Sequence, residues 1–259
     1  MKKNILFIGY GDLGSRLALI SHEVLEITGI SRSLKPSIAP DQYHSLDWFN
    51  NSAKKVDLLK NYDCLVVTLT PTSFDESGYE KGYEEGMKLI SKLVRNISFK
   101  KSLLISSTRV YKDSEEPINE LSNVNTEDFR AKSLLESEAI YSKGINSLQK
   151  TIFRLSGLYD PEMKDRIFYK QVDEFQNKLI PISANLNRLS RDQAAKIIMK
   201  FCISKTDLLM LNVSEPTVLA QERFKMLFPE KNFDDFFRID NPGKQLDISN
   251  LLKSKLLDG

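Results

Sequence analysis

The chain alternates short apolar runs with longer segments whose apolar residues recur at helical spacing. Runs of this length, rich in branched residues, are typical of buried parallel strands. The predicted strands cover residues 5–8, 24–30, 43–46, 64–69, 102–106, 151–155 and 209–213, and the predicted helices cover 15–20, 78–96, 129–141 and 191–204. Strands that alternate with helices form a parallel sheet with helices on both faces. The predicted fold class is therefore α/β, with a doubly wound parallel sheet.

The regular alternation weakens after Gly157, which suggests two parts of different size. We expect residues 1–157 to form a nucleotide-binding domain and residues 158–259 to form a smaller substrate lobe. The helix predicted at 191–204 is expected to return to the first domain, so the two parts are interleaved rather than joined by a linker. The sequence contains no internal repeat and no low-complexity segment.

A glycine motif links the first predicted strand to the first predicted helix. It reads Gly9-x-Gly11-x-x-Gly14, in the strand–turn–helix context that gives this pattern its meaning. Gly9 allows a tight turn, Gly11 lets the backbone approach a pyrophosphate, and Gly14 lets helix and strand pack closely. The helix N-terminus, with Asp12 and Leu13, offers unpaired N–H groups to phosphates. The motif predicts dinucleotide binding; the alternative is a glycine-rich structural turn.

The end of the second predicted strand bears on the choice of cofactor. In folds of this type an acid at this position binds the ribose of NAD, whereas an Arg accommodates the extra phosphate of NADP. The chain has Arg32 and Ser33 there and no acid, so NADP is favoured over NAD. Arg32 is alternatively a solvated surface charge, and Asp47 either contacts the adenine or caps a loop. Thr68, near the end of the fourth predicted strand, completes the candidate cofactor residues.

Composition excludes several other classes of function. The 37 Lys and Arg residues nearly balance the 35 Asp and Glu residues, so we expect neither a nucleic-acid nor a membrane partner. The two cysteines, Cys64 and Cys202, both lie in apolar runs and are predicted to be buried, not a disulfide or a metal site. The two histidines show no metal-ligand spacing. Without a signal peptide or a membrane-spanning run, a cytoplasmic location is expected.

Further motifs follow the glycine turn in a characteristic order. They are Ser106-Ser107-Thr108-Arg109-Val110-Tyr111, Phe153-Arg154-Leu155-Ser156-Gly157-Leu158-Tyr159, the segment 187–195, and Leu211-Asn212-Val213-Ser214. In this combination the chain resembles the extended short-chain dehydrogenases/reductases, also described as the NAD(P)-dependent epimerase/dehydratase family. The resemblance covers essentially the whole chain. It implies a Rossmann sheet with a small C-terminal substrate lobe, and a homodimer formed through the helices at 78–96 and 129–141 as the candidate assembly.

The chain departs from this family where the chemistry is expected. Typical members carry Tyr-x-x-x-Lys on the helix after the fifth strand, where Tyr donates a proton and Lys lowers its pKa. When this helix is aligned on Glu138, the Tyr position holds Arg130 and the Lys position holds Leu134. No Tyr-x-x-x-Lys occurs between Asn123 and Ser147 in any register. The chain therefore resembles an atypical branch of the family that lacks the pair.

The resemblance leaves three candidate catalytic residues, Ser107, Tyr111 and Arg130, and Tyr159 as an alternative to Tyr111. Ser107 occupies the position of the family's Ser or Thr, with a strand-end cap as its alternative role. Tyr111 is a candidate replacement proton donor, as is Tyr159. Arg130 is a candidate for binding an anionic substrate group or stabilising an alkoxide, or else it faces solvent or pairs with an acid. A positioned general acid contributes about 10²–10⁴ in rate, so its loss weakens the case for catalysis without excluding it.

Two functional hypotheses follow from the sequence. The first is an NADP-dependent oxidoreductase or epimerase-like enzyme that acts on a small polar carbonyl compound or a nucleotide-sugar-like molecule. The second is a non-catalytic NAD(P)-binding protein that senses the cofactor pool and signals to a partner.

Overall fold

A computed structural model of the chain describes residues 1–32, 36, 38–50, 56–160, 180–181, 185–227, 229, 237–238 and 244–257. At its centre is a seven-stranded sheet with strand order β11-β6-β5-β4-β1-β2-β3, in which every neighbouring pair is parallel. The strands are β1 (Lys3–Ile8), β2 (Leu25–Ser31), β3 (Gln42–Ser45), β4 (Asn61–Thr68), β5 (Ser98–Ser107), β6 (Ser147–Leu155) and β11 (Met210–Val213). The order reverses beside β1, which confirms the doubly wound fold.

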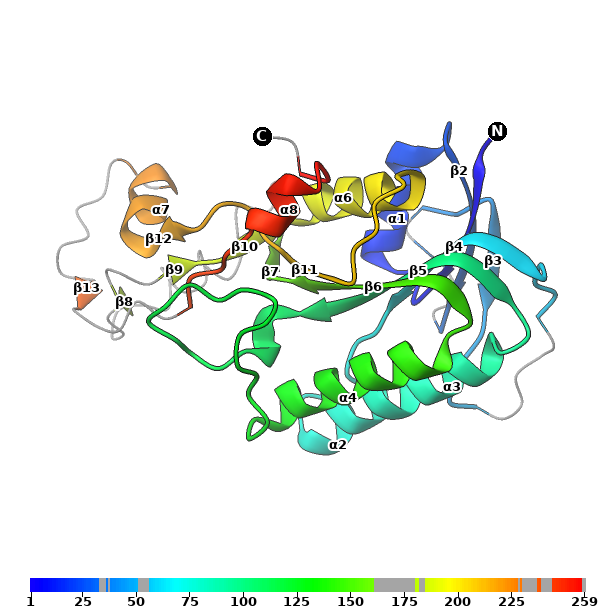
Figure 1. Cartoon of the computed structure of the whole chain (residues 1–259), viewed down its shortest axis with the longest axis horizontal. Coiled ribbons are helices and arrows are strands. Elements are labelled where there is room, and N and C mark those ends of the chain that lie inside the picture. Colours follow the sequence, from blue (N-terminus) through cyan, green and yellow to red (C-terminus); the bar gives the residue numbers. More distant parts are fainter. Residues whose placement is uncertain are drawn as a thin grey trace.

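Helices cover both faces of this sheet (Figure 1). One face carries α1 (Asp12–Ser21), α6 (Arg191–Ile203) and α8 (Ser249–Lys253). The other carries α4 (Phe129–Gly144) and a continuous helical segment made of α2 (Glu76–Tyr79), the π-helix η1 (Glu80–Glu85) and α3 (Gly86–Leu93). The sequence predicted one regular helix over 78–96 and missed the π-helical turn.

The two faces of the sheet explain why its strands read as unbroken apolar runs. In β1, Ile5 and Phe7 pack toward α1 and α6, whereas Leu6 and Ile8 pack toward α3 and α4. All four side chains are fully buried. Because successive strand residues point to opposite faces, a strand covered on both sides needs apolar residues at every position.

The two cysteines belong to the layer between the sheet and α6. Both are buried and unbonded, with the Sγ atoms of Cys64 and Cys202 separated by 3.8 Å. Burial raises the pKa of the Cys64 thiol well above its usual value, which keeps it protonated. The prediction that they are buried apolar residues is confirmed.

The C-terminal part contributes both to the sheet and to smaller structures beside it. Its helix α6 lies against α1 and β1, and β11 extends the sheet at β6. The remaining elements are the strand pairs β7 (Gly157–Tyr159) with β10 (Arg188–Ser190), β9 (Asn185–Leu186) with β12 (Val218–Leu219) and β8 (Ile180–Pro181) with β13 (Phe237–Arg238), and the helix α7 (Ala220–Leu227). Figure 1 places α7 and β12 at one end of the molecule, beyond β7 and β10. The domain boundary between 157 and 158 stays a prediction.

In the parts of the chain that the structure describes, no helix is both long enough and apolar enough to cross a membrane. The predicted homodimer also stays a prediction.

Candidate functional site

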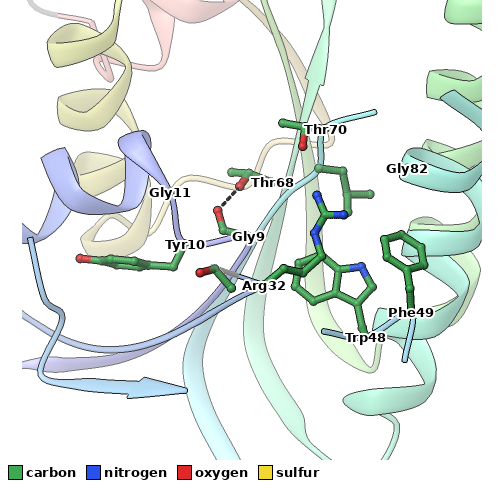
Figure 2. A pocket seen from close by; sticks show the side chains of 11 residues that line it. Gly9, Tyr10, Gly11, Arg32, Trp48, Phe49, Thr68, Thr70 and Gly82 are labelled. Carbon is green, nitrogen blue, oxygen red and sulfur yellow. Dashed lines mark hydrogen bonds between the residues drawn. The ribbon is translucent and has the colours of Figure 1, made fainter. Parts of the chain in front are cut away.

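The glycine turn is held between the ends of β2 and β4. Gly9 has a φ of +84°, which favours glycine, and a Cβ at this position would overlap the carbonyl oxygen of Thr68. The N–H of Gly9 donates to the carbonyl of Ile30 at 2.9 Å. The hydroxyl of Thr68 donates to the carbonyl of Gly9 at 2.7 Å, as Figure 2 shows. The predicted candidate Thr68 therefore fixes the turn.

The other two glycines differ in what surrounds them. A Cβ on Gly11 would meet only the carbonyl oxygen of Gly9, at 3.7 Å, so the backbone here is open to approach. A Cβ on Gly14 would lie 2.7 Å from the ring of Tyr10, so Gly14 permits close packing against that ring. Helix α1 begins directly after Gly11, and no side chain caps its first turn. The first N–H groups of α1 are thus left for a ligand.

Two cavities meet at this turn, along the carboxyl edge of the sheet. The first, of about 170 Å³, lies beside the ends of β2 and β3, and the second, of about 460 Å³, lies beside the ends of β4, β5 and β6. The described residues that line both are Gly9, Gly11, Thr68, Leu69 and Thr70. The two cavities therefore form one continuous site, where open α/β sheets bind their ligands.

Arg32 gives the first cavity its positive charge. Its guanidinium carbon lies 5.4 Å from the ring centroid of Trp48 and 5.4 Å from that of Phe49. Figure 2 shows the guanidinium beside both aromatic side chains. Arg32 is exposed, so the aromatic contacts hold the guanidinium at the mouth of the cavity while it keeps contact with solvent. The sequence analysis missed both aromatic residues, although their position directly after the third predicted strand was a usable signal.

Two other predicted residues do not join Arg32. Ser33 lies outside the described residues. Asp47 is exposed, and its carboxylate accepts a hydrogen bond from the N–H of Phe49 at 3.2 Å. The described lining of the two cavities does not include Asp47. This hydrogen bond is the loop-capping role predicted for Asp47, and the alternative of an adenine contact stays a prediction.

Three serines contribute hydroxyl groups to the second cavity. Ser107 lines it and also caps the 3-10 helix η2 (Thr108–Val110), where its Oγ accepts the N–H of Arg109 at 3.2 Å. Both roles considered for Ser107 are therefore compatible. Ser106 donates to the Glu138 carboxylate at 2.6 Å. Ser156 is buried, and its Oγ has no hydrogen-bond partner among the described residues. The sequence analysis overlooked Ser156, although it directly follows a predicted strand.

Helix α4 presents an apolar side chain to this cavity. Leu134, which the sequence alignment on Glu138 places at the Lys position of the resembled family, lines the cavity. Arg130 is not among the described lining residues; its guanidinium carbon lies 5.1 Å from the ring of Phe129. The catalytic role of Arg130 stays a prediction. Glu138 itself accepts hydrogen bonds from the buried Arg154 at 3.0 and 2.6 Å.

The tyrosines predicted as proton donors are also engaged elsewhere. Tyr111 is fully buried, and its hydroxyl donates to the side-chain oxygen of Asn212 at 2.7 Å. Burial raises the pKa of Tyr111. The hydroxyl of Tyr159 donates to the Glu215 carboxylate at 2.9 Å. Neither tyrosine is among the described lining residues, and the catalytic role of Tyr111 stays a prediction.

A charged residue from the C-terminal part completes the site. Arg191, the first residue of α6, lines the second cavity and lies 3.5 Å from the carboxylate of Asp12. Asp12 is also paired with Arg16, which in turn contacts Asp160 at 2.7 Å and so ties α1 to the end of β7. Of the two arginines, Arg191 lies farther from the Asp12 carboxylate, at 3.5 Å against 3.2 Å for Arg16, and it also lines the open cavity. Sequence reasoning missed Arg191 because residues 12 and 191 come together only through packing of α6 on α1.

The site fits an elongated phosphate-containing ligand such as a dinucleotide. The open backbone at Gly11 leaves space for a pyrophosphate, and Arg191 lies beside it. At the two ends of the site, the buried indole N–H of Trp48 and the hydroxyl of Ser156 lack partners among the described residues.

The seven-stranded parallel sheet and the glycine turn define a Rossmann-type α/β protein. No protein-family model matches the chain, and no curated protein matches its sequence. Solved structures match nearly all of it. A protein from Methylobacillus flagellatus assigned as an NAD-dependent epimerase/dehydratase is 25% identical, with a TM-score of 0.72 over 98% of this chain and 92% of that chain.

Two further structures show the same arrangement at lower identity. UDP-glucuronic acid 4-epimerase from Bacillus cereus, in complex with NAD, is 15% identical, with a TM-score of 0.76 over 98% of this chain and 91% of that chain. UDP-N-acetylglucosamine 4-epimerase from Methanobrevibacter ruminantium M1, in complex with UDP-N-acetylmuramic acid, is 18% identical, with a TM-score of 0.73 over 98% and 93%. The chain thus has the fold of the NAD-dependent epimerases/dehydratases, in agreement with the family that its motifs resemble.

Proposed function

We propose that the chain binds NADP(H) across the two cavities and is an oxidoreductase or epimerase-like enzyme acting on a small polar carbonyl compound or a sugar-like molecule. The observation that carries the proposal is one continuous site with an open glycine turn at its centre and a guanidinium at the end of β2. The adenosine half would occupy the first cavity, the pyrophosphate would lie at Gly11, and the nicotinamide would enter the second cavity.

The first cavity supports NADP over NAD. Arg32 directly follows β2, where the ribose hydroxyls of a bound dinucleotide lie in this fold. A guanidinium offers paired N–H donors to a phosphate, whereas the acid that binds the free hydroxyls of NAD is missing. The flat faces of Trp48 and Phe49 offer an apolar surface for the base and keep Arg32 oriented.

The second cavity supports chemistry on an uncharged oxygen. When bound there, the reduced cofactor supplies a hydride to a carbonyl carbon. The hydroxyl of Ser107 would orient the substrate oxygen, and Ser156 would bind a polar group with the donor that the protein leaves unused. The matching structures include enzymes named for UDP-sugars, so nucleotide sugars belong in the substrate panel.

The first experiment is an equilibrium titration of the purified protein with NADPH and with NADH, measured by nucleotide fluorescence. We expect tighter binding of NADPH, with the preference lost in Arg32→Asp. A panel of aldehydes, ketones and nucleotide sugars then follows, and any turnover should fall strongly in Ser107→Ala. If neither dinucleotide binds, the proposal is wrong.

A second function is favoured by one observation, the apolar Leu134 where the family carries Lys. A protein without that charge is suited to sensing the cofactor pool. This alternative predicts bound cofactor, no turnover across the whole panel, and a protein partner whose affinity differs between NADP⁺ and NADPH. Pull-downs that recover the same partners with NADP⁺ and with NADPH would contradict this alternative.

A further inference from the structure

The π-helix η1 brings an unassigned tyrosine to the second cavity. Its Gly82 passes so close to the loop after β4 that a Cβ there would overlap the carbonyl oxygen of Thr70. This contact fixes η1 against the loop that lines both cavities. Tyr83, the next residue, lines the second cavity together with Ser107 and Leu134. Short π-helical turns inside helices are frequent at functional sites.

The surroundings of Tyr83 suit a neutral phenol. Burial raises the pKa of Tyr83 to about 12, so the hydroxyl keeps its proton at neutral pH. The titratable and charged groups that act on it are Tyr79 on α2, which raises the pKa further, and Arg109 on η2, which lowers it. From α4 the cavity receives only the apolar side chain of Leu134 among the described residues. A group that stays protonated is able to donate a proton, which is what the reduction of a carbonyl requires.

Packing alone does not account for a tyrosine at this position. The ring of Tyr83 packs against the apolar layer between the sheet and α3, and its centroid lies 5.6 Å from that of Tyr79. Phenylalanine would make the same contacts. A tyrosine adds a hydroxyl to a cavity in which Arg130, Tyr111 and Tyr159 do not take part.

We propose that Tyr83 is the proton donor of the second cavity, in place of the Tyr that the family carries on α4. The proposal rests on the proposed function. As hydride reaches the carbonyl carbon, the C=O π bond breaks, and the carbonyl oxygen takes the proton of the Tyr83 hydroxyl. The products are an alcohol and the oxidised cofactor, and the Tyr83 phenolate regains a proton from water. Ser107 holds the substrate oxygen beside Tyr83 during this transfer.

The deciding experiment needs the cofactor but no substrate. Wild type, Tyr83→Phe and the control Tyr79→Phe are titrated from about pH 8 to 10.5 with saturating NADP⁺ or NADPH, and tyrosinate is followed by its near-ultraviolet absorbance. The cationic nicotinamide ring of NADP⁺ should lower the pKa of an adjacent phenol by about 1–2 units, so that Tyr83, with a pKa of about 12, ionises partly by pH 10.5 with NADP⁺ and stays protonated with NADPH. We expect this difference in wild type and in Tyr79→Phe, and its loss in Tyr83→Phe. Thermal unfolding confirms that both variants are folded.

The outcomes separate this inference from the proposed function. If NADPH binds and the difference between the NADP⁺ and NADPH titrations is absent in wild type, or is the same in all three proteins, Tyr83 does not contact the nicotinamide, and the inference is overturned while the proposed function stands. If no dinucleotide binds, both are overturned. If a compound in the panel of aldehydes, ketones and nucleotide sugars is turned over, Tyr83→Phe should lower kcat about 10²–10⁴-fold with NADPH affinity unchanged. Full activity in Tyr83→Phe would also overturn the inference.

Discussion

Replacing Arg32 by Gln should convert a preference for NADPH into near-equal binding of NADPH and NADH. The change removes the positive charge at the end of β2 and keeps a side chain of similar length. Two of its effects have to be separated. The first is the lost contact with the 2′-phosphate, which only NADPH carries, and the second is the lost packing on Trp48 and Phe49, which affects both nucleotides.

The exposure of Arg32 sets the size of the first effect. Two unit charges 4 Å apart attract by about 1 kcal/mol in water and about 4 kcal/mol in a partly buried site, and an exposed guanidinium belongs nearer the lower value. A hydrogen bond to a charged group adds up to about 3 kcal/mol when made in full. We therefore expect a net loss of about 2 kcal/mol for NADPH, or about 30-fold in Kd. The lost cation–π contacts contribute about 0.5–1 kcal/mol to both nucleotides, about two- to fivefold.

Fluorescence titration of NADPH and NADH, at low and high salt, measures both effects. Arg32→Lys should be intermediate, because it keeps the charge and loses the paired donors. Lys88→Gln on the exposed side of α3 is the matched control for net charge and should leave both affinities unchanged. If Arg32→Gln weakens NADPH and NADH equally, Arg32 acts only through packing and the assignment of NADP is refuted. The assignment of NADP is also refuted if Arg32→Gln does not change the affinity for NADPH.

Three further variants probe the rest of the site. Gly9→Ala should abolish NADPH binding and lower the free energy of unfolding by at least about 1–3 kcal/mol, because the residue must adopt a φ of +84° against the carbonyl of Thr68. Arg191→Gln should weaken NADPH about five- to tenfold and reduce the salt dependence of binding, because a half-exposed charge contributes about 1 kcal/mol. Glu138→Gln should lower the free energy of unfolding by about 3–5 kcal/mol in urea titrations, since it leaves the buried guanidinium of Arg154 without its charged partner.

The two charge variants each have a control on the same element. Lys196→Gln removes an exposed charge from α6, and Glu136→Gln removes one from α4; neither should change the measured quantity by more than about 0.5 kcal/mol. An unchanged stability in Gly9→Ala would contradict the strained turn. Unchanged NADPH affinity in Arg191→Gln would show that Arg191 serves only to neutralise Asp12.

The sequence predicted the sheet well because burial on both faces leaves a strong signal in each strand. It placed the ends of β5 less well. The prediction began at Ser102, whereas the strand begins at Ser98 and includes Lys100 and Lys101, whose charges interrupt the apolar run. The side chain of Lys101 is buried, and its Nζ donates at 2.5 Å to the carbonyls of Phe201 and Ser204 at the end of α6. A lysine that satisfies the last carbonyls of a distant helix cannot be told from a solvated one in a single sequence.

The residues of the candidate site also fall into those that local sequence features predict and those that they do not. Its cofactor half follows from local features, since Gly9, Gly11 and Arg32 stand directly at strand ends. The catalytic half required tertiary information. Arg130 was placed by alignment with the family's pattern and Tyr111 by its position after the fifth predicted strand, whereas the ring of Phe129 beside Arg130 and the hydrogen bond from Tyr111 to Asn212 appear only in the structure. The π-helix at η1 has no periodicity signal of its own in so short a segment, so Tyr83 was not singled out as a candidate.

The two halves of the site are built from different residues and meet at Phe49. Arg32 contacts Trp48 and Phe49, Tyr83 contacts Tyr79, and the ring of Phe49 also lies 5.5 Å from the Nζ of Lys81 on η1. Residues that share partners couple, so Arg32→Gln and Tyr83→Phe are measured singly before they are combined. On the proposed function, a proton donor supplies part of catalysis and not the binding energy for the cofactor. An enzyme with its donor on η1 keeps that part, while a sensor does without it, and turnover in the substrate panel distinguishes the two.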